Sequence, residues 1–423
     1  MDSPLQLFAW VILAGLAVVV GQFIVNQFRL FRFARQSAEL EHEYLRERIS
    51  QLAQRRRETR DQAEASWSGF RKFRIVDKVL EARDVCSFYL SPHDGKPLPA
   101  FRPGQYLTFQ LRLPGQTRPV VRCYSLSDRP GILERYRVTI KRVPPPPNQP
   151  DAPPGLVSNY FHDQLGVGDI VDVKAPAGQF VLDLDQPSPV VLIAGGVGLT
   201  PLLSMVNALA ETRSTREVWF FYGVRQGREH IMQEHLRALT DRLPTLRLHV
   251  CYSDPSEEDR AATPPAFQHT GRVSIDLLKR LLPSNQFDFY ICGPPPMMNA
   301  LVDGLRAWQV PAERIHFEAF GSATVKKPAL QFPGSTTTQA LKIQFSRSGK
   351  VCAWREDAGS VLELAEKNGV AIDSGCRAGN CGTCLVAVKS GEVTYLHEPG
   401  AQVEAGSCLA CIAVPKTALV LDA

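Results

Sequence analysis

Three cysteines near the C-terminus have the spacing of ligands for a small inorganic cluster. Cys376, Cys381 and Cys384 follow the pattern C-x4-C-x2-C, in which one loop wraps around an iron–sulfur cluster and a distant cysteine completes it. Glycines between these ligands allow tight turns that point backbone N–H groups toward sulfide. Both Cys408 and Cys411 lie at a suitable distance to be the fourth ligand. The spacing predicts a [2Fe–2S] centre, which carries single electrons, because structural zinc sites usually use C-x2-C pairs.

Two motifs in the middle of the chain have residue types that suit nucleotide-like cofactors. The segment 195–201 reads Gly-Gly-Val-Gly-Leu-Thr-Pro and follows an apolar run, and glycines there let a ligand approach the backbone at the end of a strand. The segment 122–125 reads Arg-Cys-Tyr-Ser. In a strand, Arg122 and Tyr124 share one face and Ser125 lies on the other.

The elements that hold these motifs change in character along the chain. Residues 70–186 contain short alternating runs broken by Pro and Gly, which predict an antiparallel β-barrel. Residues 187–320 contain continuous apolar strands separated by helical segments, which predict a parallel-sheet α/β domain. Its first helix is expected to have Thr200 as the N-cap and Pro201 in the first turn. Residues 321–340 are rich in Gly, Ser, Thr and Pro and predict a linker.

Residues 341–423 resemble plant-type ferredoxin domains, which have a β-grasp-like fold. In that family the fourth ligand lies in a C-x-x-x-P context, which Cys411 matches through Pro415. Cys408 would then be a free or packing thiol. The metal ligands implied by the resemblance are Cys376, Cys381, Cys384 and Cys411.

The order of the motifs at 122–125, 195–201 and 292–294 resembles the ferredoxin–NADP reductase superfamily. The barrel looks most like the reductase half of flavohaemoglobins. The resemblance implies that Arg122 pairs with a flavin phosphate and that Tyr124 lies against the isoalloxazine ring. Ser125 would then offer a hydrogen bond near the hydride-accepting flavin N5.

A second phosphate loop is implied at residues 155–160, where backbone N–H groups at a helix start would bind pyrophosphate. The residues implied there are Gly155, Val157 and Ser158. A second phosphate favours FAD, and FMN is the alternative because one reductase family with this domain order uses it.

The same resemblance implies a pyridine nucleotide site. Cys292 and Gly293 would lie near the nicotinamide C4 atom, and Phe320 near the flavin, so Ser125 and Cys292 are the expected catalytic residues. The loop residues implied are Gly195, Gly196, Gly198 and Thr200. Arginines at 225 and 228 could meet a 2′-phosphate, but they also occur in relatives that use NADH. We expect NADH, with NADPH as the alternative.

The N-terminus predicts a membrane anchor. Residues 5–28 carry no charge, and as a helix they span about 36 Å, enough for a hydrocarbon core of about 30 Å. Arginines at 29, 32 and 35 follow the apolar run, which places the remainder in the cytoplasm. We expect a single transmembrane helix over 1–28 in a bacterial-type inner membrane, followed by a helical stalk over 29–69.

The composition sets limits on partners. A net charge of +5 is small for 423 residues, and the chain has no basic stripe interleaved with aromatic residues, so nucleic acid is not an expected partner. The expected enzyme is a multidomain, membrane-anchored NAD(P)H-dependent reductase. It would pass electrons from NADH through flavin and the cluster to a terminal acceptor, an oxygenase, hydroxylase or desaturase that is itself membrane-bound in some systems. The alternative is the NADH-input subunit of a respiratory or quinone-reducing membrane complex.

Overall fold

The structure is a computed structural model, and it describes residues 15, 21–22, 26–27, 46, 66–116, 119–145, 151, 154–320, 340–355, 358–375, 377, 379, 382–396, 399 and 403–423. The chain divides into a unit of Met1–Ala65 and a unit of Ser66–Ala423. Almost all of the predicted anchor and stalk therefore falls outside the described residues. Within the described residues, no helix combines the length and apolar character needed to cross a bilayer.

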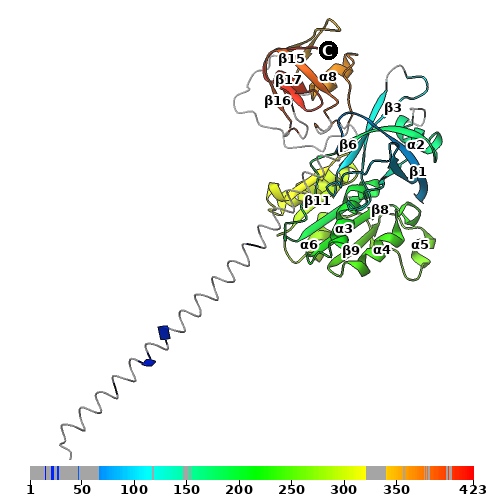
Figure 1. Cartoon of the computed structure of the whole chain (residues 1–423), viewed down its shortest axis with the longest axis vertical. Coiled ribbons are helices and arrows are strands. Elements are labelled where there is room, and N and C mark those ends of the chain that lie inside the picture. Colours follow the sequence, from blue (N-terminus) through cyan, green and yellow to red (C-terminus); the bar gives the residue numbers. More distant parts are fainter. Residues whose placement is uncertain are drawn as a thin grey trace, which may run out of the picture. The chain divides into compact units, whose positions relative to one another are not determined.

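The first domain of the second unit is an antiparallel sheet of six strands in the order β4-β3-β6-β1-β2-β5 (Figure 1). An isolated bridge joins Leu126, just after β4, to Val138 of β5. The two edge strands therefore meet, and the sheet closes around a buried aromatic and aliphatic core. The elements are β1 (Arg71–Ala82), β2 (Val85–Pro92), β3 (Tyr106–Leu111), β4 (Val120–Ser125), β5 (Tyr136–Lys141), α2 (Leu156–Asp163) and β6 (Ile170–Ala177).

Residues 66–69, which we expected to end the helical stalk, are not helical. The Trp67 indole nitrogen donates to the Val173 carbonyl at 3.0 Å, and its ring centroid lies 5.6 Å from that of Phe73. Arg71 lies over the Trp67 ring at 5.2 Å. These contacts hold the segment on the barrel, so it belongs to that domain.

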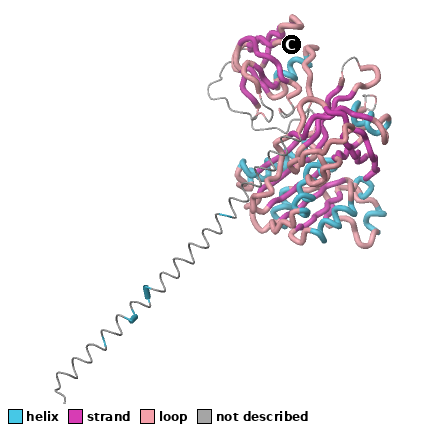
Figure 2. Tube along the Cα trace, viewed as in Figure 1, coloured by secondary structure: helices cyan, strands magenta, loops and turns pink. Residues whose placement is uncertain are grey.

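The second domain is a parallel sheet in the order β10-β9-β8-β7-β11-β12, shown as magenta strands between cyan helices in Figure 2. Both faces are buried: alternate residues of β7 pack with α3 and α4 on one side and with α6 and α7 on the other. Such burial explains the continuous apolar strands. The strands are β7 (Val190–Gly195), β8 (Val218–Val224), β9 (Leu246–Tyr252), β10 (His269–Thr270), β11 (Asp288–Cys292) and β12 (Ile315–Glu318). The helices are α3 (Leu199–Glu211), α4 (Gln233–Arg242), α5 (Glu257–Ala261), α6 (Ile275–Leu281) and α7 (Pro295–Ala307).

The start of α3 differs from our expectation. The helix begins at Leu199, its N-cap is Gly198, and no side chain caps it. Gly198 already has helical dihedral angles at the end of a 3₁₀ turn over Gly196–Gly198. Thr200 is therefore inside the first turn, where its hydroxyl donates to the Val197 carbonyl at 3.0 Å.

The third domain is a sheet in the order β14-β13-β19-β15-β17 with a separate β16-β18 pair. Helix α8 begins with a capping box between Ser360 and Glu363 and packs against the sheet in one core. The elements are β13 (Leu341–Phe345), β14 (Lys350–Trp354), α8 (Val361–Lys367), β15 (Leu385–Ser390), β16 (Val393–Tyr395), β17 (Ser407–Leu409), β18 (Ala413–Pro415) and β19 (Leu419–Leu421). All but the last residue of the predicted linker, 321–339, lies outside the described residues.

Candidate functional site

Strand β4 holds the three residues predicted to bind flavin. The Tyr124 ring lies 5.7 Å from the Phe109 ring and 5.4 Å from the Phe161 ring, and burial raises the pKa of its hydroxyl above the ordinary value. Arg122 is exposed, and its Nη1 donates to the Val121 carbonyl at 2.7 Å. Among the described side chains, no carboxylate pairs with Arg122, which leaves its charge available for an anionic ligand.

Ser125 ends β4 opposite Tyr106 of β3. It is 5% exposed, and within the described part of the chain its hydroxyl makes no hydrogen bond. The next residue, Leu126, donates its N–H to the Gln105 carbonyl at 2.8 Å. The backbone around Ser125 is thus held while its side chain keeps its bonding capacity for a ligand.

The predicted second phosphate loop is the start of α2, and the Phe161–Tyr124 ring contact places this helix beside β4. Gly155 is the N-cap and supplies no side-chain hydrogen bond, so the first N–H groups remain open to an anion. A Cβ at Gly155 would lie 2.7 Å from the Ser158 Oγ. Ser158 itself donates to the Gly155 carbonyl at 3.2 Å, and Val157 is buried in the barrel core.

The predicted nucleotide loop lies at the switch point of the parallel sheet. Strand β7 has β8 on one side and β11 on the other, and ligands bind open α/β sheets where strand order reverses. A Cβ on Gly198 would lie 2.3 Å from the Cys292 carbonyl oxygen, and one on Gly195 would lie 2.7 Å from the Pro294 Cδ. A Cβ on Gly293 would lie 3.0 Å from the Gly195 nitrogen. The loops after β7 and β11 therefore touch through their backbones.

Gly196 has a different reason to be glycine. Its φ is +53°, and a Cβ there would meet nothing within 4 Å. The backbone conformation favours glycine, and the space beside it remains open for a ligand.

Cys292 ends β11 beside the last residue of β12, Glu318, with which it is in register. The thiol is fully buried, and burial, with a smaller contribution from Glu318, raises its pKa well above the ordinary range. The sulfur is therefore a neutral thiol that can pack against a ring, and it is not a thiolate nucleophile.

Glu318 is a site residue that sequence reasoning missed. Its Oε2 atom is buried and has no hydrogen-bond partner among the residues that the structure describes, and burial raises the pKa of the carboxyl to about 8. The group therefore keeps its proton at neutral pH. The available signal was a lone acid between the apolar residues Phe317 and Ala319. Phe320, two residues later, is 39% exposed. Its ring is therefore accessible to a ligand, as its predicted place near the flavin requires.

The two arginines considered for a 2′-phosphate follow β8. The Arg225 Nη2 atom pairs with the Asp254 carboxylate at 3.1 Å, and both side chains are largely exposed. Asp254 follows β9, the next strand of the sheet, and its N–H donates to the Arg225 carbonyl at 2.9 Å. A phosphate that approached Arg225 would therefore also meet a carboxylate.

Two of the four predicted cluster ligands are described, and their sulfur atoms are adjacent. Cys384 and Cys411 are both buried, and their Sγ atoms lie 3.0 Å apart. The Gly379 N–H donates to the Cys411 sulfur at 3.3 Å, as predicted for a loop that turns its amides toward sulfur. Cys408 is fully buried in the same core. Cys376 and Cys381 lie outside the described residues.

Comparison with known families assigns a family to each of the three domains. Residues 72–182 match the oxidoreductase FAD-binding domain, residues 192–303 match the oxidoreductase NAD-binding domain, and residues 344–416 match the 2Fe-2S iron-sulfur cluster binding domain. The barrel, the switch-point loop and the cysteine loop fall within these three matches in turn.

Individual proteins and solved structures are similar to the same parts of the chain. The FAD/NAD-binding domain of nitric oxide dioxygenase from Vibrio cholerae is 33% identical with a TM-score of 0.53, over 60% of this chain and 100% of that one. The chain belongs to the ferredoxin–NADP reductase superfamily. A flavohemoprotein from Bacillus cereus is 42% identical over 62% of this chain, and the chain spans 63% of that protein's length. Phthalate dioxygenase reductase is 28% identical with a TM-score of 0.50, over 84% of this chain and 98% of that one.

The described residues of the three domains fit the cofactors of this superfamily. The helix start at Gly155 and the exposed guanidinium of Arg122 suit flavin phosphates. The backbone contact at Gly198 and the open space at Gly196 suit a nucleotide, and adjacent buried sulfurs suit a cluster. The three matched domains are those with which oxidoreductases bind FAD, NAD and a 2Fe-2S iron-sulfur cluster.

Proposed function

We propose that this oxidoreductase is the reductase component of an oxygenase, hydroxylase or desaturase system, held at the membrane by residues 1–28. Electrons from NADH would leave through the [2Fe–2S] domain to a separate acceptor protein.

The observation that carries the proposal is the order of the domains. Flavin, nucleotide and ferredoxin domains follow one another in this chain, and phthalate dioxygenase reductase is similar over nearly its whole length. That reductase has a modular structure for electron transfer from pyridine nucleotides to [2Fe–2S]. The [2Fe–2S] cluster of a ferredoxin domain carries one electron at a time, which suits delivery of single electrons to an acceptor.

The cofactors supply the redox chemistry, which is hydride transfer between nicotinamide and flavin and one-electron transfer at the cluster. The chain's own residues place and tune them. The Ser125 hydroxyl offers a hydrogen bond on the flavin side, and the neutral Cys292 thiol packs on the nicotinamide side. Glu318 holds a proton beside Cys292 at neutral pH.

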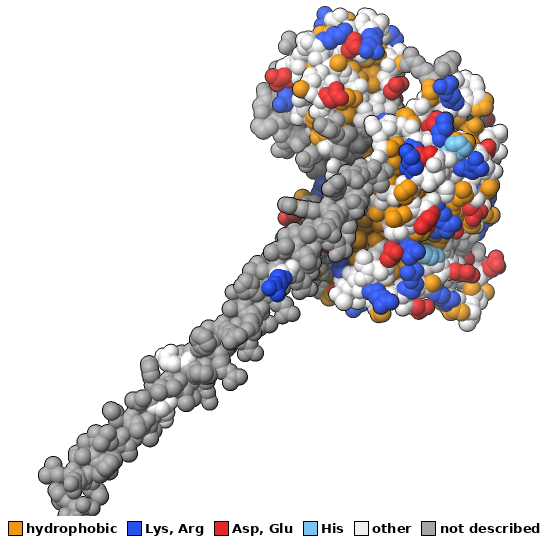
Figure 3. Space-filling view, in the orientation of Figure 1, with side chains coloured by type: hydrophobic (Ala, Val, Ile, Leu, Met, Phe, Trp, Pro, Cys, Tyr) orange, Lys and Arg blue, Asp and Glu red, His pale blue; other side chains and the backbone are white. Residues whose placement is uncertain are grey.

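Charge gives little information about the acceptor. On the described part of the face shown in Figure 3, basic and acidic side chains are interspersed. A face of this kind favours no partner of strong single-sign charge.

An anaerobic titration tests the electron path. Full-length protein is titrated with NADH while flavin absorbance and the electron paramagnetic resonance signal of a reduced [2Fe–2S] cluster are recorded. We expect flavin bleaching and a cluster signal together. Bleaching without a cluster signal would contradict delivery through the ferredoxin domain, and no bleaching with either NADH or NADPH would contradict the reductase itself.

The anchor and the acceptor need a second experiment. Full-length protein and a variant without residues 1–28 are expressed, and membrane and soluble fractions are assayed for NADH–ferricyanide activity. We expect the full chain in the membrane fraction and the truncated chain in the soluble one. Quinone reduction by the purified full chain, at a rate comparable to that with ferricyanide, would instead favour the respiratory alternative.

A further inference from the structure

Helix α3 carries a line of polar residues in an otherwise apolar sequence. Thr200, Ser204, Asn207 and Glu211 are separated by four, three and four positions. At about 100° per residue these positions fall within an arc of about 60°, on one face of the helix. Ser204 is fully buried and Asn207 is 5% exposed. Buried polar groups cost stability unless they are hydrogen-bonded, so this face requires partners.

Three residues of this face, Ser204, Asn207 and Glu211, contact the flavin barrel. The Ser204 Oγ accepts a hydrogen bond from the Gly104 N–H at 2.8 Å, across 100 positions of sequence. The Asn207 Nδ2 lies 3.5 Å from the Ser127 carbonyl, and Glu211 accepts from Arg129 at 3.0 Å. Asn207 is oriented from its other side, where its Oδ1 accepts from the His235 Nε2 at 2.8 Å.

Ser204 is the member of this line that connects the two cofactor sites. Besides accepting from Gly104, its hydroxyl donates to the Pro201 carbonyl at 2.8 Å, and Pro201 follows the nucleotide loop directly. On the barrel side, Gln105 follows Gly104, and its carbonyl accepts the Leu126 N–H at 2.8 Å. Leu126 follows Ser125, the predicted flavin ligand. Three hydrogen bonds thus join the first turn after the nucleotide loop to the end of the flavin strand.

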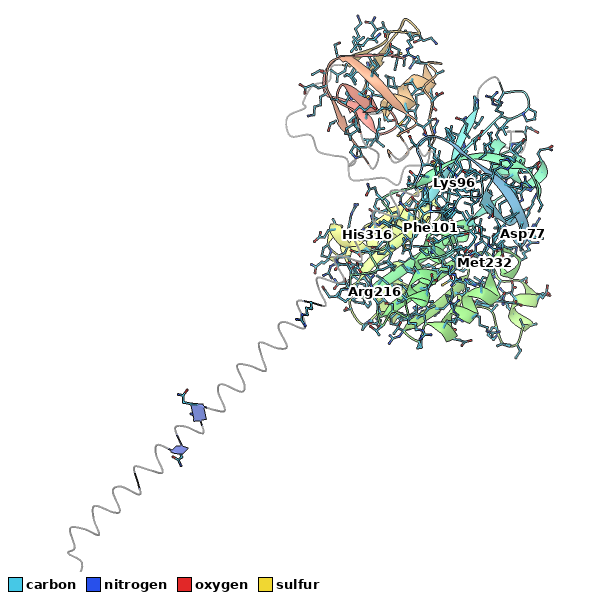
Figure 4. The ribbon with its side chains drawn as sticks, in the orientation of Figure 1. Asp77, Lys96, Phe101, Arg216, Met232 and His316 are labelled. Atoms are coloured by element: carbon cyan, nitrogen blue, oxygen red, sulfur yellow. The ribbon has the colours of Figure 1, made fainter. Side chains whose placement is uncertain are left out.

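The barrel segment in this path has little freedom to move. A Cβ at Gly104 would lie 2.0 Å from the Phe180 carbonyl oxygen and 2.7 Å from the Met205 Cε of α3. Phe101, labelled in Figure 4, is buried in the barrel core three residues earlier, with its ring 5.9 Å from that of Tyr136. The loop is therefore packed from both sides, and Ser204 bonds to a rigid group.

We infer that Ser204 is a positioning residue for hydride transfer. Its hydrogen bonds set the distance between the nucleotide loop and the flavin strand β4. The inference rests on NADH-dependent flavin reduction by this chain. Hydride transfer requires reacting atoms at about 3–3.5 Å, and a displacement of about 1 Å can slow an enzyme about 100-fold. Ser204 touches neither cofactor site directly, and it acts through Pro201 and Gly104.

The test compares Ser204→Ala with two other variants of full-length protein. Thr212→Val is the matched control, because Thr212 lies just after α3 and its hydroxyl donates to the Ala208 and Leu209 carbonyls of that helix. Ser204→Thr keeps the hydroxyl, which a helical threonine can direct at the carbonyl one turn earlier. Flavin content, iron content and melting temperature are measured first, so that loss of folding is distinguished from loss of positioning.

Stopped-flow flavin bleaching at saturating NADH is the main readout. For Ser204→Ala we expect at least a tenfold slower limiting rate, an NADH dissociation constant within about twofold of wild type, and weaker long-wavelength charge-transfer absorbance between nicotinamide and flavin. Ser204→Thr should recover most of the rate, and Thr212→Val should match wild type. A limiting rate for Ser204→Ala within twofold of Thr212→Val would overturn the inference, as would a rate loss that only follows flavin loss. Bleaching of the wild type by NADH tests the reductase function separately.

Discussion

Replacing Gly198 with alanine tests the contact between the two nucleotide loops. A Cβ on Gly198 would lie 2.3 Å from the Cys292 carbonyl oxygen, 2.5 Å from its carbon and 2.7 Å from the Gly293 nitrogen. All three atoms are backbone, so no side-chain rotation can relieve the overlap. Since real Cβ contacts stay above 3.0 Å, the loops must separate by at least 0.7 Å, the difference between 3.0 and 2.3.

The expected cost of this separation appears in catalysis more than in folding. Overpacking of this kind costs about 1–3 kcal/mol of stability, which a domain with two buried faces can tolerate. A displacement that approaches 1 Å at the nicotinamide site is expected to lower the rate of NADH-dependent flavin reduction about 100-fold. FAD and iron content should not change, because the atoms that the new Cβ would overlap belong to Cys292 and Gly293 of the nucleotide domain.

The assay is stopped-flow flavin bleaching by NADH, with chemical reduction by dithionite as the check that flavin and cluster remain competent. Gly95→Ala is the control for backbone strain alone, since Gly95 lies in a barrel turn outside the predicted sites, its Cβ would meet no atom within 4 Å and only its positive φ is strained. That strain costs about 1 kcal/mol. If Gly198→Ala reduces flavin as fast as Gly95→Ala and the wild type, the loops do not touch as described and our reasoning about the site is wrong.

Three further predictions concern single side chains. Because the pKa of Glu318 is about 8 in the folded protein against an ordinary 4.5, the folded state holds an extra proton between these values. The free energy of unfolding should therefore fall by about 1.4 kcal/mol per pH unit as pH rises from 4.5 to 8, and urea titrations of Glu318→Gln should lack this slope. Asp254→Asn removes the carboxylate beside Arg225 and should raise kcat/KM with NADPH about tenfold, or about 1.4 kcal/mol, with little change for NADH; an unchanged NADPH/NADH ratio would exclude Asp254 as a selector. Cys411→Ser should lose most of the iron while Cys408→Ser keeps it, and equal iron in both purified variants would contradict the ligand assignment.

Local patterns were sufficient to predict the types of the three domains. The C-x4-C-x2-C run predicts a cluster because ligand spacing along one loop is set by covalent geometry. Strand period separates the barrel from the parallel sheet, since a strand buried on both faces is apolar throughout and a half-buried one alternates. The glycines at 195 and 198 were predicted from sequence for their closeness to a ligand, and the structure adds their contact with the loop after β11.

Boundaries and caps were predicted less well. Thr200 was expected to cap α3, but the preceding 3₁₀ turn moves the helix start to Leu199. Trp67 was placed in a helical stalk, yet its indole bonds to Val173, 106 positions later. In both cases neighbouring structure outweighed the local preference of the residue.

The sequence by itself determined which cofactor chemistry this protein carries, because the cysteine run and the glycine loop are each contained in a short segment. Only the tertiary structure decided which distant groups share a site. Glu318 lies beside Cys292 because β12 pairs with β11, Asp254 meets Arg225 because β9 follows β8 in the sheet, and Ser204 meets Gly104 across the two domains. These contacts depend on strand order and packing between segments far apart in the chain, and no local periodicity encodes them.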